Sequence, residues 1–226
     1  MKLSEKLLKK NEITWRSLFS HPFVQGIGDG SLPIEKYLFF LKEDYFYLKE
    51  YSRVLAIASA KAPDKELQKF FAEFLHSTMT FEMELHRRTC EELGIPRDEL
   101  DLHDPTVLTL SYTNFLIKTA YEGDIVEILA SLFPCEYSYW EIGKLLKRRG
   151  MPRRNIYRDW IETYSSEKFG EIASRLKEFL DRFTESVGDK KFERIDEVFR
   201  ESLRFELYFW ENAYREGLIR DIFSKK

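Results

Sequence analysis

Apolar residues recur every three to four positions along nearly the whole chain, which is the spacing that places them on one face of an α-helix. No run of alternating apolar and polar residues is long enough to indicate a β-strand. Prolines, glycines and short polar segments divide the pattern into separate helices. These are expected at about 4–19, 34–61, 64–93, 106–121, 124–149, 155–187 and 190–216. The pattern predicts an all-α protein, and the short connections favour antiparallel neighbours in a bundle.

The length and composition of the chain favour one helical domain spanning residues 1–226. A hydrophobic content of 43% can fill a sizeable core, and the sequence contains neither an internal repeat nor a linker. Cys90 and Cys135 are the two cysteines, and their lack of any paired spacing predicts reduced thiols and a cytoplasmic location. The net charge of -3 gives no field that would attract nucleic acid, and no apolar run is long enough to cross a membrane.

Three predicted helices carry reactive side chains on their apolar faces. Asp44 lies on the stripe of the helix at 34–61, and Glu206 lies at the edge of the stripe at 190–216. Cys135 and Tyr139 share the apolar face of the helix at 124–149, where Cys135 directly follows Pro134. A proline inside a helix removes a backbone hydrogen bond and marks a local distortion. A thiol, two acids and several tyrosines are therefore expected to converge inside the bundle.

These residues also have ordinary structural interpretations. A buried free cysteine usually behaves as a small hydrophobic residue. An acid on an apolar stripe can cap a neighbouring helix or pair with an arginine, and most buried tyrosines belong to the core. Glu82 and His86, four residues apart, can form half of a metal site, but the other histidines and acids lack matching spacing, so no metal is expected. The pattern alone leaves a reactive centre and a structural core as alternatives.

A set of motifs distributed over nearly the whole chain resembles the thiaminase II (TenA) family. The N-terminal part of the resemblance is His21-Pro22-Phe23, followed by Gly30 and Leu32. The remaining segments are 44–48 (DYFYL), Glu82, 85–86 (LH), 134–135 (PC), Tyr139, 141–143 (EIG), 205–206 (FE), 209–210 (FW) and 213–214 (AY). The resemblance implies a heme-oxygenase-like bundle of about seven helices. It also implies an enzyme of thiamin salvage that hydrolyses aminomethylpyrimidine, and secondarily thiamin, to hydroxymethylpyrimidine.

The resemblance assigns roles to individual positions. Cys135 matches the family's nucleophile, and Glu206 matches the acid placed against a ring nitrogen of the pyrimidine. Asp44 matches the carboxylate that accepts hydrogen bonds from the exocyclic amine of the substrate. The aromatic residues matching the pocket are Tyr47, Tyr112, Tyr139, Tyr164 and Phe23. The hydroxyls of Tyr112 or Tyr139 are expected to favour the thiolate, and Phe205, Tyr208 and Phe209 to desolvate Glu206.

One segment departs from the family pattern. Glu136 and Tyr137 follow the cysteine, where the family often carries Trp or Tyr, and this difference bears on the preference for a leaving group. The resemblance implies a homotetramer and no cofactor. The other function classes are an oxidase on the same fold, which would require bound iron, heme or quinone, and a non-catalytic pyrimidine-binding or regulatory protein.

Overall fold

A computed structural model of the protein describes residues 1–217, and this part of the chain contains helices and no strand. The helices are α1 (Leu3–Lys10), α2 (Glu12–Ser20), α3 (Pro22–Asp29), α4 (Ile34–Lys61), α5 (Lys65–Ser77), η1 (Thr78–Glu82), α6 (Met83–Glu92), α7 (Arg97–Asp101), α8 (Val107–Glu122), α9 (Ile125–Arg149), α10 (Asn155–Tyr164), α11 (Glu167–Arg182) and α12 (Asp189–Arg215). The prediction of an all-α protein is confirmed.

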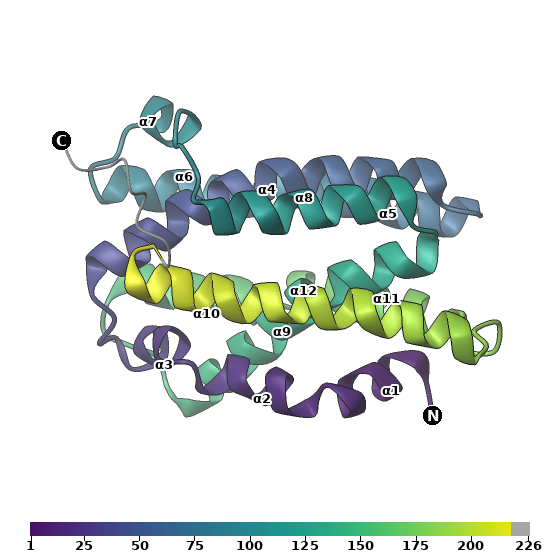
Figure 1. The fold of residues 1–226 in the computed structure, drawn as a ribbon. Helices are drawn as coiled ribbons and strands as arrows, with labels where there is room; N and C mark the ends of the chain where they lie inside the picture. The colour runs from purple at the N-terminus through teal and green to yellow at the C-terminus, as the bar shows by residue number, and fades with distance from the viewer. Residues whose placement is uncertain (218–226) are drawn as a thin grey trace.

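The helices form layers around α9 and α12 (Figure 1). Helices α4, α5 and α8 run along one side of the molecule, and α1 to α3 lie on the opposite side of α12. Helix α9 packs against α8, α10, α11 and α12. Because α9 touches several other helices, 16 of its 25 residues are buried. A surface helix buries fewer, since only one of its faces is apolar.

Local sequence explains where several helices begin. Asp124 accepts hydrogen bonds from the backbone N–H groups of Val126 and Glu127, while Glu127 accepts from the backbone of Asp124, so the pair forms a capping box at the start of α9. Thr106 caps α8 in the same way through Thr109. These caps satisfy backbone donors that have no partner within the helix.

Three predicted helices are subdivided in the structure. The helix expected at 4–19 breaks at Asn11, whose side-chain amide donates to Leu7 of α1 and to Asp196 of α12. The helix expected at 155–187 ends at Tyr164 and restarts at Glu167, with Ser166 capping the new helix. The helix expected at 64–93 is interrupted by η1, a π-helical turn. The short helices α3 and α7 were not predicted.

Candidate active site

The helix that carries the thiol runs through its internal proline without a break. Helix α9 spans Ile125–Arg149, with Pro134 inside it and Cys135 directly after. Pro134 has no N–H to donate, so the carbonyl of Ala130 lacks its usual helical partner. Farther along, a Cβ added at Gly143 would lie 2.7 Å from the backbone carbon of Tyr164. Glycine at this position therefore lets the end of α10 approach α9 and places Tyr164 beside Tyr139, with ring centroids 4.9 Å apart.

Glu206 lies at the end of a hydrogen-bonded chain inside the bundle. The hydroxyl of Tyr112 donates to Glu206 Oε1 and lies 3.3 Å from the hydroxyl of Ser202. Ser202 in turn donates to the carbonyl of Ser131 on α9 at 2.6 Å. Burial raises the pKa of Glu206 to about 8, against the opposing effect of the Tyr112 hydroxyl. The carboxyl is thus protonated at neutral pH, as its apolar setting predicts.

Cys135 and Glu206 affect each other's pKa inside the bundle. Burial raises the pKa of the Cys135 thiol well above its ordinary value, and the carboxyl groups of Glu206 and Glu136 raise it further. The hydroxyl of Tyr47 opposes this rise, although it makes no hydrogen bond of good geometry and has no other partner. The thiol is therefore protonated in the resting site. Of the two tyrosines expected to favour the thiolate, Tyr112 donates its hydroxyl hydrogen bond to Glu206, and the role of Tyr139 stays a prediction.

Asp44 is paired with a histidine from another helix. His86 Nε2 lies 2.7 Å from Asp44 Oδ2, and His86 Nδ1 lies 2.9 Å from the carbonyl of Glu82. Burial alone would lower the pKa of His86, but the hydrogen bond to Asp44 and its negative charge outweigh burial and raise it. Both ring nitrogens of His86 are engaged, so the ring orientation is fixed. Asp44 is 3% exposed and points into the bundle, as its place on the apolar stripe predicts.

The π-helical turn η1 brings a further carboxyl group to the same region. Glu82, the last residue of η1, accepts a hydrogen bond from the Tyr164 hydroxyl at 2.9 Å. Burial raises its pKa to about 7, and the charge of Asp44 adds to the rise. A π turn inserts an extra residue into a helix and often occurs at functional sites. Here the insertion directs Glu82 toward Tyr164 while His86, on α6, turns toward Asp44.

The aromatic residues surround these polar groups. The Tyr47 and Tyr112 ring centroids are 5.0 Å apart, and Tyr139 lies 5.0 Å from Trp210. Phe23 joins this aromatic group through Trp210, on which it stacks with ring centroids 5.2 Å apart. The structure thus brings Tyr47, Tyr112, Tyr139 and Tyr164 to the region of Cys135 and Glu206. Phe23 supports that region through Trp210.

The desolvating residues around Glu206 differ in part from expectation. Phe209 is buried and Phe205 stacks on Tyr112 with ring centroids 4.9 Å apart. Tyr208, in contrast, is 42% exposed and faces outward. Its position on α12, two residues after Glu206, turns it away from the core. The prediction that Tyr208 shields Glu206 is therefore wrong.

A pocket of about 520 Å³ opens beside this region, between η1, α6 and the helices α10 and α11. Glu82, Thr78 and Leu85 belong to its lining, together with the aromatic rings of Phe74 and Phe169. Glu82 lines this pocket and also accepts a hydrogen bond from Tyr164, whereas Cys135, Asp44 and Glu206 are not part of the lining. A cavity of this size can hold a small heterocycle.

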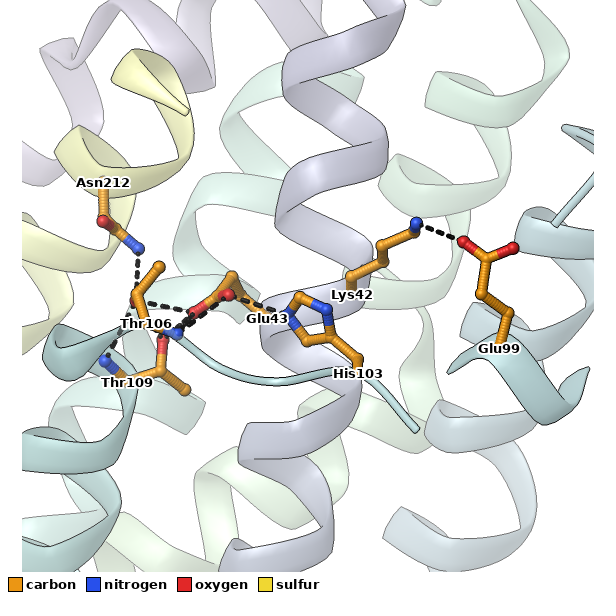
Figure 2. A network of polar contacts seen from close by, with 7 residues as sticks. All are labelled: Lys42, Glu43, Glu99, His103, Thr106, Thr109 and Asn212. Carbon is orange, nitrogen blue, oxygen red and sulfur yellow. Dashed lines mark hydrogen bonds and ion pairs between the residues drawn. The ribbon is translucent and has the colours of Figure 1, made fainter. Parts of the chain in front are cut away.

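A second polar network fixes α4, the helix that carries Asp44 and Tyr47 (Figure 2). Glu43 accepts hydrogen bonds from the backbone N–H of Thr106 and from the hydroxyls of Thr106 and Thr109, and its Oε1 lies 2.8 Å from His103 Nε2. Asn212 of α12 donates to the Thr106 hydroxyl at 3.1 Å. The network joins α4, α8 and α12, so it holds the register of the three helices that provide Asp44, Tyr112 and Glu206.

Residues 1–217 contain no group of three or more His, Cys, Asp or Glu side chains arranged to hold a metal ion. Glu82 accepts a hydrogen bond from Tyr164, and His86 is paired with Asp44, so both side chains take part in interior hydrogen bonding. No helix of the described chain is long and apolar enough to span a membrane.

Sequence reasoning missed two groups of the site. It did not foresee that His86 pairs with Asp44, because the two residues are 42 positions apart. It also treated Glu136 only as a departure from a pattern, whereas the side chain is 2% exposed and accepts a hydrogen bond from Tyr51 at 3.2 Å. Its position directly after Cys135 was the available signal.

Comparison with known proteins gives consistent matches along the chain. Residues 8–216 match the model of the TENA/THI-4/PQQC family. An "Aminopyrimidine aminohydrolase" from Halalkalibacterium halodurans is 37% identical over 221 residues, which cover 96% of this chain and 98% of the relative.

Solved structures give the same picture. The TenA homologue from P. horikoshii OT3 is 33% identical, covers 96% of this chain and 100% of its own, and has a TM-score of 0.87. A "TenA family transcription regulator" from Silicibacter sp. TM1040 is 29% identical with a TM-score of 0.88, covering 94% of this chain and 96% of its own. A domain with a heme oxygenase-like fold from Shewanella denitrificans OS217 is 17% identical with a TM-score of 0.72, covering 94% and 92%. The fold is therefore the heme-oxygenase-like helical fold that the sequence predicts.

Proposed function

This chain belongs to the TENA/THI-4/PQQC family, and from that membership we propose that it is an aminopyrimidine aminohydrolase of thiamin salvage. Its substrate is aminomethylpyrimidine, with thiamin as a secondary substrate, and its pyrimidine product is hydroxymethylpyrimidine. The observation that carries the proposal is the placement of a thiol and a protonated carboxyl, Cys135 and Glu206, within reach of each other inside a bundle lined by tyrosines.

The first step is addition of the Cys135 thiol to the pyrimidine ring. The sulfur bonds to a ring carbon while Glu206 gives its proton to a ring nitrogen and receives the proton of the thiol. This exchange avoids a free thiolate, which burial disfavours. It also avoids a buried negative charge on Glu206, since the carboxyl remains protonated throughout. Tyr112 holds the carboxyl in place for both transfers.

Addition breaks the aromaticity of the ring and prepares the exocyclic bond for cleavage. The carbon–nitrogen bond of the protonated aminomethyl group then breaks, and its electron pair leaves with the nitrogen as ammonia. Water bonds to the methylene carbon and passes one proton to a carboxylate of the site. Finally the first step runs in reverse, because the sulfur–carbon bond breaks and Glu206 returns the ring proton to the thiol. The net reaction converts a protonated aminomethyl group and water into a hydroxymethyl group and ammonium, because the ammonia takes up the proton that the water released.

Recognition of the pyrimidine falls to Asp44 and the aromatic residues. Asp44 accepts a hydrogen bond from the exocyclic amine of the ring, and His86 holds the carboxylate for this contact. A substrate analogue without the amine leaves this carboxylate with His86 as its partner and without the hydrogen bond from the ring, which is unfavourable at a buried site. Tyr47, Tyr139 and Tyr164 provide flat surfaces for the ring, and Phe23 supports them through Trp210.

Incubation of the protein with aminomethylpyrimidine and, separately, with thiamin tests this proposal. We expect hydroxymethylpyrimidine from both, with faster turnover of the aminomethyl compound. Cys135→Ala should abolish turnover, whereas Cys90→Ala, which removes the other buried thiol, should leave it unchanged. An oxidase would instead consume oxygen and depend on iron, heme or quinone. A regulatory protein would bind the pyrimidine and release no product, and either result would reject the hydrolase.

We further propose that the protein acts in the cytoplasm as a homotetramer. Both cysteines are free and buried, which suits a reducing compartment. Sedimentation velocity of the purified protein tests the assembly, and a sedimentation coefficient of a monomer at micromolar concentration would reject it.

A further inference from the structure

Besides the indole nitrogens of Trp160 and Trp210, three buried side-chain oxygen atoms of the described chain have no hydrogen-bond partner, and all three belong to the region of the candidate active site. They are the Tyr47 hydroxyl, the Thr78 hydroxyl and Glu136 Oε2. Their residues are 3%, 1% and 2% exposed. Buried polar groups are almost always paired, because an unpaired one loses its hydrogen bonds to water without replacement. The side chains lie on α4 and on two elements that pack against it, η1 and α9, which indicates that a ligand supplies the missing partners.

Glu136 is the most polar of these unpartnered groups. Its Oε1 accepts from the Tyr51 hydroxyl at 3.2 Å, which holds the side chain in one orientation and leaves Oε2 free. Glu136 follows Cys135 directly on α9, so the two side chains leave adjacent positions of the same helix. Its charge acts on both Cys135 and Tyr51, and the charge of Glu82 acts on Glu136.

Glu82 approaches the same place from the pocket side. It belongs to the lining of the 520 Å³ pocket together with Thr78, and one of its oxygens accepts from Tyr164. The charges facing the two acids are those of Asp44 on α4, His86 on α6 and Glu206 on α12. Asp44 and His86 form a pair of opposite sign, and Glu206 is protonated at neutral pH. No cation of the described chain is paired with Glu82 or Glu136.

We propose that Glu136 and Glu82 form the leaving-group subsite of the enzyme and that they select substrates whose leaving group is a positively charged amine. This inference rests on the proposed function. A primary alkylammonium group offers N–H donors to Glu136 Oε2 and to the hydroxyl of Thr78, and it neutralises one ionised carboxyl of the pair. A neutral leaving group, such as a formylated amine, provides the hydrogen bonds without the charge. The pair therefore favours the free amine.

The same carboxylate completes the proton balance of the reaction. When the ammonium is bound, one acid of the pair is protonated and the other is a carboxylate. Ammonia leaves with the electron pair of the carbon–nitrogen bond, and water enters the position it vacates. As the water oxygen bonds to the methylene carbon, the carboxylate takes one of its protons. The departing ammonia then removes this proton as ammonium, and the pair returns to its starting state.

Binding without turnover tests the subsite. In the Cys135→Ala variant, calorimetry at pH 7 should give tighter binding of aminomethylpyrimidine than of hydroxymethylpyrimidine, which has the same shape and no charge, by about tenfold. Adding Glu136→Gln should remove this preference and leave the affinity for hydroxymethylpyrimidine within about twofold. Glu141→Gln, on the same helix and paired with Lys144, is the matched control and should preserve the preference. Equal affinity for both ligands in Cys135→Ala, or an unchanged preference after Glu136→Gln, overturns the inference.

Kinetics separate this inference from the proposed function. With Cys135 intact, Glu136→Gln should lower kcat/KM for aminomethylpyrimidine by at least about tenfold and change it by less than about threefold for the N-formylated substrate. An equal loss on both substrates indicates general damage to the site and rejects the subsite. If Glu136→Gln does not fold, Glu82→Gln addresses the same pair from the pocket side and should shift the ratio in the same direction. A wild-type protein that binds the amine preferentially but hydrolyses neither substrate rejects the hydrolase and retains the subsite.

Discussion

Replacing Glu206 with glutamine should stabilise the protein by an amount that grows with pH. The Glu206 carboxyl has a pKa of about 8 in the folded protein and an ordinary value of 4.5 when exposed. Above pH 4.5 the unfolded chain releases this proton while the folded protein retains it. Stability from Glu206 is therefore complete below pH 4.5 and is lost as the pH rises toward 8. Glutamine has the same shape and does not titrate.

The size of the effect follows from the two pKa values. Between the two pKa values, the wild type loses about 1.4 kcal/mol of unfolding free energy for each unit of pH. The stability difference between Glu206→Gln and the wild type should therefore grow by about 2.5 kcal/mol from pH 5 to pH 7. Glu206 is fully buried, so solvent does not screen the effect. For a chain of this length the change corresponds to about 5–10 °C in Tm. Above pH 8 the difference should stay constant.

Thermal unfolding of both proteins at pH 5, 6, 7 and 8 measures this prediction. Glu201→Gln is the matched control, because Glu201 lies on the same helix in a surface pair with Arg204. The Tm difference between this variant and the wild type should be the same at all four pH values. The reasoning is refuted if the Tm difference between Glu206→Gln and the wild type is the same at all four pH values. Turnover gives a second test, since the variant lacks the acid and should be nearly inactive at every pH.

Three other changes probe the support of the site. Gly143→Ala places a methyl group 2.7 Å from the Tyr164 backbone and should lower the free energy of unfolding by about 1–3 kcal/mol, with a lower kcat/KM because Tyr164 moves. His86→Leu leaves Asp44 buried without its partner and should lower the free energy of unfolding in urea by about 3–5 kcal/mol. Adding Asp44→Asn should restore part of that free energy. If the double variant is no more stable than His86→Leu, the pairing is rejected. Glu43→Gln should lower the free energy of unfolding by about 1–3 kcal/mol at pH 7. Although burial opposes it, the hydrogen bond from His103 holds the pKa of Glu43 below 4.5, so this loss should shrink in acid as the wild-type carboxyl becomes protonated. A loss that does not depend on pH would contradict this.

The fold was predictable from sequence where local patterns decide it. The long helices at 34–61 and 124–149 agree with α4 and α9, because apolar spacing and the Asp124 cap define them locally. The break at Asn11 was not predictable, since its amide is drawn to Asp196, 185 positions away. The start of α3 had a local signal that was overlooked, because Pro22 occupies the first helical position and the ring of His21 caps the helix.

For the site, the sequence could predict which side chains point into the bundle, because helical periodicity sets the direction of each one. Inward positions of Asp44, Cys135 and Glu206 follow from helical periodicity, and their roles came from the family resemblance. The partner of Asp44 depends on η1, because the π turn sets the direction in which His86 points. A one-residue insertion in a helix leaves no periodic signal over so short a segment. Hydrogen bonding across helices therefore had to come from the structure.

The four buried acids of the site are unfavourable for folding, so their presence points to a role in the reaction. Asp44, Glu82, Glu136 and Glu206 come from four different elements, and the charge of Asp44 raises the pKa of each of the other three. Burying like charges is unfavourable, so three of the four are held partly or fully protonated and the fourth is paired with His86. A core of the same volume built from apolar residues would be more stable. The arrangement stores protons at neutral pH beside a thiol, and a reaction that adds a thiol to a heterocycle and releases an amine requires protons at those positions.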